Sequence, residues 1–350
     1  MQAIVESLGL AGHEHVQVVH DARAGLLCVV AVHSTALGPA MGGVRRTSYP
    51  DLDAALRDAL ALSSAMTLKN SAAGLPLGGG KSVIVDGAPR ASAELLDGFA
   101  AVVDALGGRY VAAEDIGTTP GDMDALAQRT RWVAGVSPAQ GGTGDPSPST
   151  AATVFGAIEQ AVRVAHGSAD LAGRRVGVLG AGKVGGALVE LLAARGAELL
   201  VADLDRARLA DVAARTGARA VAVEELLEAR LDVLAPCARG GVIARDTVGR
   251  LRAGIVCGAA NNILADDALA DDLHAQGILY VPDFIANAGG IVQVGGEFLG
   301  WSGERRAEAL AAAIARTGTV LDEAAADGVP PLHVALRTAA ARLEAAAVAS

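Results

Sequence analysis

Apolar and polar residues alternate along the chain with two different periods. Short runs rich in Val, Ile and Leu predict strands over 26–34, 81–87 and 109–115. Segments rich in Ala and Leu, with apolar residues three or four positions apart, predict helices over 51–74 and 92–107. Strands that alternate with helices in this way are typical of an α/β protein.

The second part of the chain repeats this alternation more tightly. Residues 174–205 predict a strand, a glycine-rich turn, a helix and a second strand, with no long loop between them. Further strand and helix units are predicted at 231–238, 254–262 and 278–287, and helices at 308–328 and 332–350. We therefore expect a doubly wound, Rossmann-like sheet in this part of the chain.

The length of 350 residues exceeds the usual size of one domain, so we expect two domains separated by a cleft. Residues 135–149 collect Gly, Pro and Ser, which places a hinge there, and a helix is predicted to begin at about Thr150. We assign 1–134, joined by a C-terminal helix at 327–350, to an N-terminal α/β domain. The Rossmann-like domain is assigned to 145–326.

The composition argues against several classes of protein. The chain has 39 acidic and 29 basic residues and no basic stretch that could follow a phosphate backbone, so we expect no nucleic-acid partner. Every apolar run is shorter than the roughly 18 residues that span a bilayer, and the N-terminus lacks the order of a secretion signal. Cys28, Cys237 and Cys257 match no metal-binding spacing. We expect a cytoplasmic enzyme with no metal and no membrane contact.

A glycine-rich turn carries the clearest chemistry in the sequence. Gly180, Gly182 and Gly185 form G-x-G-x-x-G between a predicted strand and a predicted helix, where the backbone and the helix N-terminus can hold a pyrophosphate. Close helix packing alone would explain these glycines, but not Asp203, which ends the next strand and can bind ribose hydroxyls. The domain at 145–326 is therefore predicted to bind NAD in preference to NADP, although two nearby arginines leave weak use of NADP open.

Two lysines of the N-terminal domain lie at junctions of predicted elements. Lys81 follows three glycines, which we expect to leave room for a substrate against the backbone, and Lys69 ends the preceding helix. If the two lysines lie close together and are partly buried, the charge of one and the loss of hydration lower the pKa of the other toward the range of a general base. Glu114 and Asp115 end another predicted strand, and we expect at most one of the two to face the cleft. The alternatives are surface lysines and a carboxylate that only caps a turn.

Several segments resemble the Glu/Leu/Phe/Val dehydrogenases, which are NAD(P)-dependent oxidative deaminases of L-amino acids. The resemblance spans nearly the whole chain and follows the order of that family's sequence blocks. The blocks that carry it are LGPAMGGVR, AMTLKNSAAGLPLGGGKSVI, GGRYVAAEDIGTTPGDMD, GGTGDPSPSTA, APCARGGVI, CGAANN and GILYVPDFIANAGG.

The resemblance implies a role for individual residues. Lys69 would hold the substrate carboxylate with help from Asn262, Lys81 would be the catalytic base, and Asp115 would transfer protons to and from the amine. Thr150 would contact the nicotinamide amide. The full set assigned to the cofactor is Gly180, Gly182, Lys183, Val184, Gly185, Asp203, Thr150, Ala238 and Asn262. The N-terminal domain is thus assigned to substrate binding, catalysis and oligomerisation.

The substrate side chain is expected to be hydrophobic. Met41 would form the floor of its pocket and Val294 the wall, while Gly42 and Gly43 border the substrate. Bulk at both positions favours a leucine-, valine- or isoleucine-sized group, and Glu114 also resembles the leucine enzymes. Other segments are similar to phenylalanine dehydrogenases, so an aromatic substrate remains the alternative.

Three other functions are weighed against this one. A hydroxy-acid dehydrogenase would need a cleft histidine, and no histidine stands in a comparable glycine-framed setting. An amine dehydrogenase is disfavoured because Lys69 and Asn262 are both present. A non-catalytic NAD-binding regulator would not need Lys81. The expected partners are the amino acid, its 2-oxo acid, ammonia and further copies of the same chain in a homo-oligomer.

Overall fold

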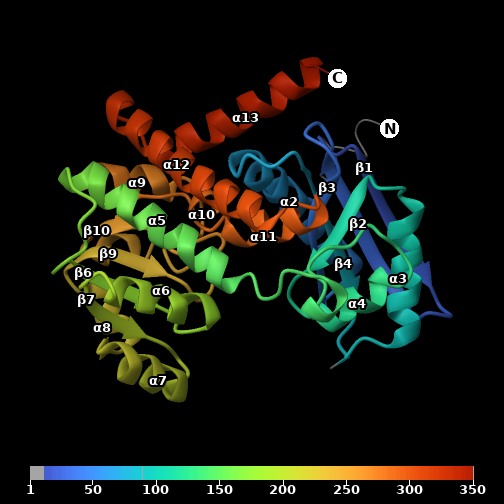
Figure 1. The fold of residues 1–350 in the computed structure, drawn as a ribbon, viewed down its shortest axis with the longest axis horizontal. Coiled ribbons are helices and arrows are strands. Elements are labelled where there is room, and N and C mark those ends of the chain that lie inside the picture. The colour runs from blue at the N-terminus through green and yellow to red at the C-terminus, as the bar shows by residue number, and fades with distance from the viewer. Residues whose placement is uncertain (1–11, 89, 350) are drawn as a thin grey trace. The chain divides into compact units, whose positions relative to one another are not determined.

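The computed structural model describes residues 12–88 and 90–349, which form two compact units (Figure 1). The first unit holds the chain up to Gly144, together with Gln293–Arg305 and the segment from Ala339 onward. The second unit holds Asp145–Val292 and Arg306–Thr338. These limits differ from the predicted ones, in which 293–305 belong to the Rossmann-like domain and 327–338 to the N-terminal domain.

The carboxylate of Glu297 anchors residues 293–305 in the first unit. Glu297 accepts hydrogen bonds from the backbone N–H groups of Gly135 and Thr143, both at 2.8 Å, and from that of Val136 at 3.2 Å. The hydroxyl of Thr143 also donates to Glu297, at 2.8 Å. A sequence pattern gives no sign of such a long-range anchor, which explains the difference in the domain limits.

The first unit is built on a five-stranded mixed sheet of order β1-β2-β4-β3-β5. β1 and β2 pair antiparallel, as do β2 and β4, whereas β3 pairs in parallel with β4 and β5. The strands are β1 (His15–Asp21), β2 (Leu26–Ser34), β3 (Ala40–Thr47), β4 (Gly78–Val85) and β5 (Tyr110–Glu114). The helices before Gly144 are α2 (Leu52–Ala72), α3 (Ala93–Ala105) and α4 (Pro120–Ala127).

The two-residue period of β2 divides the core of this unit into two layers. Val29 and Ala31 pack with Ala55 and Ala59 of α2 on one face of the sheet. Val30 packs with α3 residues on the opposite face. The strands and helices predicted between residues 26 and 115 are confirmed with shifts of a few residues at their ends.

The second unit contains a six-stranded parallel sheet of order β11-β10-β9-β6-β7-β8. The strands are β6 (Arg175–Leu179), β7 (Glu198–Ala202), β8 (Arg219–Ala220), β9 (Leu231–Pro236), β10 (Ala253–Val256) and β11 (Leu279–Tyr280). Strand order reverses between β6 and β9, which is the topological switch point of a doubly wound sheet. The predicted α/β fold with a Rossmann-like domain is confirmed.

The α-helices that the structure describes after Gly144 extend to the end of the described chain. They are α5 (Ser147–His166), α6 (Lys183–Ala193), α7 (Arg206–Thr216), α8 (Val223–Glu228), α9 (Leu269–Ala275), α10 (Asp283–Ala286), α11 (Gly289–Phe298), α12 (Gly303–Asp327) and α13 (Pro331–Ala349). α5 begins at Ser147, so the end of the predicted 135–149 connector is helical. The carboxylate of Asp145 accepts the backbone N–H of Ser147 at 2.9 Å and orders this start. Across residues 12–88 and 90–349, no helix combines the length and apolarity needed to cross a bilayer.

Candidate active site

Three neighbouring strands of the first unit bring a lysine and an aspartate together. Lys81 lies on β4 and is only 5% exposed, and Asp115 directly follows β5. The Nζ atom of Lys81 lies 2.5 Å from Oδ2 of Asp115. β3 runs between β4 and β5, so both side chains must reach across its backbone.

Gly43 leaves the space in which this pair meets. A Cβ atom at Gly43 would lie 3.0 Å from Nζ of Lys81 and 2.6 Å from Cβ of Asp115. A Cβ atom at Gly42 would lie 1.7 Å from the carbonyl oxygen of Gly80. The glycines of β3 are therefore required by contacts within the protein.

The three glycines before Lys81 serve packing within the protein, in addition to any room that they leave for a substrate. Cβ atoms at Gly78, Gly79 and Gly80 would lie 1.9 Å from Ser34 O, 2.1 Å from Thr67 N and 2.7 Å from the Tyr110 ring. These glycines let β4 approach β2, α2 and the ring on β5, and so they bury Lys81. The sequence pattern could not distinguish room for a ligand from room for a neighbouring strand.

Burial and charge act together on the two titrating groups. Burial lowers the pKa of Lys81 because its ammonium loses hydration, and Asp115 offsets only part of this effect. Burial alone would raise the pKa of Asp115, but the charges of Lys81 and Arg45 outweigh it and hold that pKa below its ordinary value. The pair therefore combines a carboxylate that stays ionised with an amine that releases its proton more easily than a surface lysine.

The turn after β5 holds Asp115 in place. The Thr118 hydroxyl accepts the backbone N–H of Asp115 at 2.9 Å and donates to the Val44 carbonyl at 3.0 Å. The next helix, α4, is capped by Thr119 together with Asp122. Turn and cap thus use other side chains, and the Asp115 carboxylate remains directed at Lys81.

Apart from Asn262, which is in the second unit, the other residues assigned to the substrate lie on several elements of the first unit. Lys69 is in the last turn of α2 and half-buried, and Glu114 is exposed at the end of β5. The side chain of Met41 is completely buried on β3. Val294 is half-buried on α11, with its Cγ1 atom 3.7 Å from the Cβ position of Gly135.

In the second unit, the glycine turn follows β6 at the switch point. A Cβ atom at Gly180, which has φ of +103°, would lie 2.8 Å from Ala238 N, and one at Gly185 would lie 1.9 Å from Gly180 O. A Cβ atom at Gly182 would meet nothing nearer than 4.0 Å, where Nη1 of Arg208 lies. Two glycines are thus needed for packing, whereas the space beside Gly182 is open to a ligand at the N-terminus of α6.

Asp203 directly follows β7 and supports the turn. Its carboxylate accepts the backbone N–H of Ala181 at 2.6 Å and that of Asp205 at 2.7 Å, one on each oxygen. Lys183, the first residue of α6, forms an exposed ion pair with Asp145 at 3.0 Å. Residues of the turn, α6 and α7 line a pocket here, among them Gly182, Lys183 and Arg208.

The remaining residues assigned to the cofactor surround this part of the sheet. Thr150 lies in the first turn of α5, where its hydroxyl donates to the Pro146 carbonyl at 3.1 Å. Asn262 is exposed, has φ of +51°, and donates its backbone N–H to Asp283 Oδ2 at 2.9 Å. Ala238 is exposed after β9, and Val184 is half-buried in the first turn of α6.

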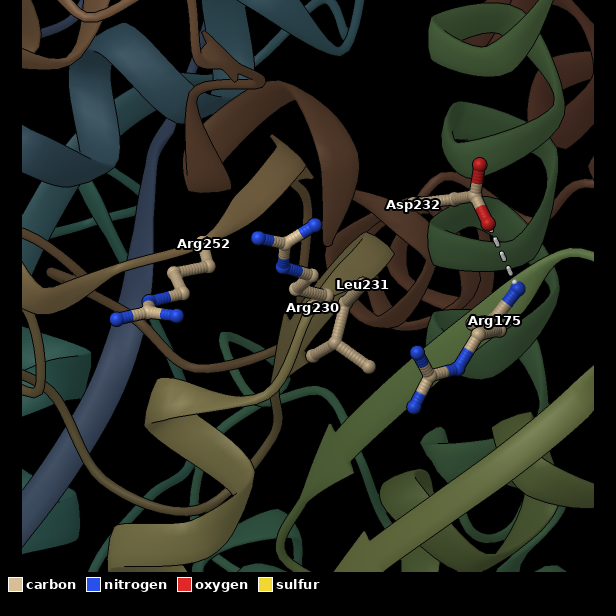
Figure 2. Close-up of a pocket in the computed structure, with 5 residues that line it drawn as sticks. All are labelled: Arg175, Arg230, Leu231, Asp232 and Arg252. Atoms are coloured by element: carbon tan, nitrogen blue, oxygen red, sulfur yellow. Dashed lines mark hydrogen bonds between the residues drawn. The ribbon is translucent and has the colours of Figure 1, made fainter.

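A further pocket lies at the amino ends of the strands of the same sheet, opposite the glycine turn. It is lined by Arg175, Arg230, Leu231, Asp232 and Arg252, where β6, β9 and β10 begin. Figure 2 shows these side chains, with Asp232 accepting the backbone N–H of Arg175 at 2.8 Å. Parallel α/β sheets bind ligands at the carboxyl ends of their strands, so this pocket is not the dinucleotide site.

No group of three or more His, Cys, Asp or Glu side chains among residues 12–88 and 90–349 could hold a metal ion. All three cysteines are free thiols. Burial raises the pKa of Cys28 and that of Cys237 to about 12, which makes both thiols poor nucleophiles at neutral pH.

One signal in the sequence points to the functional lysines without any family resemblance. Only three of the 29 basic residues are lysines, and these are Lys69, Lys81 and Lys183. All the other basic residues of the chain are arginines. Lysine differs from arginine in that it can lose its proton within the physiological range when buried. Its retention at Lys81 therefore favours proton transfer there.

Comparisons with known proteins agree with this arrangement. Residues 13–132 match the Glu/Leu/Phe/Val dehydrogenase dimerisation domain, and residues 198–350 match the Glutamate/Leucine/Phenylalanine/Valine dehydrogenase domain. Residues 157–238 match the NAD-binding domain of the D-isomer specific 2-hydroxyacid dehydrogenases.

Individual relatives match almost the whole chain. Leucine dehydrogenase of Bacillus subtilis (strain 168) is 40% identical over 334 residues, which cover 95% of this chain and 92% of that protein. Valine dehydrogenase of Streptomyces virginiae is 43% identical over 336 residues, which cover 95% of this chain and 94% of that protein. The crystal structure of L-tryptophan dehydrogenase from Nostoc punctiforme is 34% identical, with a TM-score of 0.86 and 99% of both chains covered. The chain belongs to the Glu/Leu/Phe/Val dehydrogenase family.

Proposed function

We propose that this protein catalyses the NAD-dependent oxidative deamination of a hydrophobic L-amino acid to its 2-oxo acid and ammonia. The reaction is reversible, so the same residues would serve reductive amination. The observation that carries the proposal is the buried contact between Lys81 and Asp115, held in space that Gly43 leaves open. This pair supplies a base and a proton-transfer group in a chain whose second unit has a dinucleotide-binding turn.

The residues of the second unit fit a dinucleotide. Open space beside Gly182 and the N-terminus of α6 would receive the pyrophosphate, with Lys183 adding positive charge. Each oxygen of Asp203 accepts one backbone hydrogen bond and keeps a lone pair for a ribose hydroxyl. A carboxylate there would repel a 2′-phosphate, which favours NAD over NADP. When bound, the nicotinamide accepts the hydride that leaves Cα of the amino acid.

The acid and base steps fall to residues of the first unit. Loss of hydride from Cα leaves a substrate iminium, and Lys81 in its neutral form takes a proton from the water that attacks this carbon. Asp115 contacts the Lys81 ammonium that this step forms, and it passes that proton on to the amine of the resulting carbinolamine. Lys81, neutral again, then takes the proton of the carbinol hydroxyl as the C=O bond of the 2-oxo acid forms and the C–N bond breaks to release ammonia. Lys69 remains charged and binds the substrate carboxylate, with Asn262 as a second contact.

Aliphatic substrates are favoured over aromatic ones. Met41 and Val294 are the residues that we assign to the side-chain pocket, and the leucine and valine dehydrogenases above share 40% and 43% of their aligned residues with this chain. An aromatic substrate is the second candidate, because the L-tryptophan dehydrogenase structure resembles the chain over its whole length.

We also infer that the active form is a homo-oligomer. The first unit matches a domain described as a dimerisation domain, and β1 is one of the two edge strands of its sheet. A glutamate dehydrogenase of Thermus thermophilus that is 25% identical, with a TM-score of 0.77, is a hetero-hexamer. The number of copies can be measured by light scattering.

The test is NADH formation at alkaline pH from L-leucine, L-valine, L-isoleucine, L-phenylalanine, L-tryptophan and L-glutamate. Wild type is compared with Lys81→Ala and with Arg129→Gln, which breaks an exposed ion pair with Asp97 in the same unit. We expect turnover of an aliphatic substrate, a loss of at least about 100-fold in Lys81→Ala, and an unchanged rate in Arg129→Gln. Absence of turnover across the panel, with NAD still bound, would instead support a non-catalytic NAD-binding regulator.

A further inference from the structure

Arg45 connects the Lys81 and Asp115 pair to a second carboxylate. Its Nε atom donates to Oδ2 of Asp115 at 3.2 Å, the same oxygen that Lys81 contacts. Its Nη1 atom donates to both oxygens of Asp58, at 3.2 and 3.0 Å. The Tyr49 hydroxyl also donates to Asp58. Positive and negative groups therefore alternate from Lys81 through Asp115 and Arg45 to Asp58.

The backbone of β3 explains why Arg45 can make these contacts. Side chains two residues apart on a strand project to the same face, so Arg45 shares its face with Gly43, beside which Lys81 and Asp115 meet. Asp58 lies on α2, which packs against this face of the sheet. The planar guanidinium can donate to two carboxylates at once, which a lysine at this position could not do in the same geometry.

The neighbouring Arg46 provides a contrast. It is 8% exposed, donates to the carbonyls of Gly117 and Ala88, and forms an ion pair with Asp86 at 2.5 Å. Arg46 thus anchors loops, and none of these contacts touches Asp115 or Lys81. A purely structural role for Arg45 would need only its bond to Asp58, whereas its Nε is directed at the oxygen that contacts Lys81.

We propose that Arg45 is a positioning residue that fixes the Asp115 carboxylate beside Lys81 and, through its own charge, favours the neutral form of that lysine. The effect on catalysis rests on the proposed function, since it takes Lys81 as the base. The effect on Lys81 itself is a property of the protein without substrate.

The charges around Lys81 determine the direction of the effect. Asp115 at the end of β5 and Asp58 on α2 favour its ammonium form, while Arg45 on β3 opposes it. The Nε of Arg45 and the Nζ of Lys81 contact one oxygen, so they lie at most about 6 Å apart, where one charge shifts a titration by roughly 0.5–2 pH units. Replacing Arg45 by a neutral residue removes the opposing charge and leaves both carboxylates, so the pKa of Lys81 rises.

The experiment follows the titration of Lys81 directly by NMR. Labelling with [ε-¹³C]lysine gives signals from three side chains in the wild type, whose chain contains three lysines, and from four in Arg45→Lys. Lys81→Met, made in the wild type and in Arg45→Lys, identifies the Lys81 signal in each. Wild type is compared with Arg45→Gln, Arg45→Lys and Arg57→Gln, the last of which breaks an exposed ion pair with Asp53 on α2 as the matched control. The pH dependence of kcat/KM for the preferred amino acid is measured on the same proteins.

We expect the Lys81 midpoint to rise by about one pH unit in Arg45→Gln and to stay within a few tenths of a unit in Arg57→Gln. The acid limb of kcat/KM moves upward by the same amount, because less neutral lysine is present at each pH. Arg45→Lys keeps the charge and restores the midpoint, but it lowers kcat because Asp115 is no longer held from two sides.

An unchanged Lys81 midpoint in folded Arg45→Gln would overturn the proposal, whatever the activity. The Lys81 midpoint could instead rise while the acid limb of kcat/KM stays in place. Arg45 would then act on Lys81, but Lys81 would not be the base, so the proposed mechanism would fail and the role of Arg45 would stand. Far-UV circular dichroism and thermal unfolding establish that each variant is folded. If Arg45→Gln does not fold, the Lys81 midpoint is compared between Arg45→Lys and Arg45→Met. A higher midpoint in Arg45→Met supports the proposal, and equal midpoints overturn it.

Discussion

Gly43→Ala is expected to separate catalysis from folding. The added Cβ would lie 2.6 Å from Cβ of Asp115 and 3.0 Å from Nζ of Lys81, whereas unstrained carbon atoms stay roughly 3.5–4 Å apart. Asp115 must therefore move by about 1 Å, which breaks its 2.5 Å contact with Lys81. A misplacement of about 1 Å at a catalytic group can lower the rate by about 100-fold.

The stability cost of this variant is expected to leave the protein folded. Overpacking destabilises by roughly 1–3 kcal/mol, which corresponds to a fall in Tm of roughly 1–4 °C if the 350 residues unfold together. The contrast is Gly42→Ala, whose Cβ would lie 1.7 Å from the backbone oxygen of Gly80 and cannot be relieved by a side-chain movement. That variant should fail to fold.

The assays are kcat/KM for the preferred amino acid and thermal unfolding, with Gly121→Ala as the control. A Cβ atom at Gly121, in the first turn of α4, would lie 3.7 Å from its nearest neighbour, so this variant should retain activity and Tm. If Gly43→Ala kept the wild-type kcat/KM, contact between Lys81 and Asp115 would not be needed for turnover. The reasoning from Gly43 would then be wrong.

Four other variants test the cofactor site and the anchor at α11. Asp203→Asn should weaken NADH binding by about 10-fold and reduce the preference over NADPH, as measured by fluorescence titration; an unchanged preference would remove Asp203 from cofactor selection. Gly185→Ala should prevent folding of the second unit because its Cβ would lie 1.9 Å from Gly180 O, whereas Gly182→Ala should fold and only weaken NADH binding. Equal Tm losses in these two glycine variants would contradict this distinction. Glu297→Gln loses acceptors for buried N–H groups and should lower the unfolding free energy by about 2–4 kcal/mol in urea denaturation; a loss below about 0.5 kcal/mol would show that the anchor is not needed.

Local patterns predicted most of the fold because the same residues that define the period also form the core. Val29 and Ala31 alternate with Val30 across the two faces of β2, so the period and the burial coincide. β3 was not predicted, because Gly42 and Gly43 interrupt its apolar pattern. Those glycines are required by neighbours on β4 and β5, which a single segment does not reveal.

The candidate site could be predicted only in part for a similar reason. The local setting of Lys81 indicated proton transfer and the family resemblance added Asp115, but the contact between them depends on β3 lying between β4 and β5. Arg45 and Asp58 are ordinary charged residues in the sequence, and their link to Asp115 arises from the position of α2 on the sheet. The rarity of lysine in the chain was the one further signal that could have been read without a structure.

The most direct test of the proposed reaction is the fate of the hydrogen on Cα. The protein is incubated with NAD and L-leucine or L-valine deuterated at Cα, and the products are measured by mass spectrometry together with an ammonia assay. We expect deuterium in the reduced nicotinamide, with the 2-oxo acid and ammonia formed in equal amounts, and formation of all three at least about 100-fold slower in Lys81→Ala. Reduced cofactor without deuterium, or 2-oxo acid without ammonia, would contradict the proposed deamination.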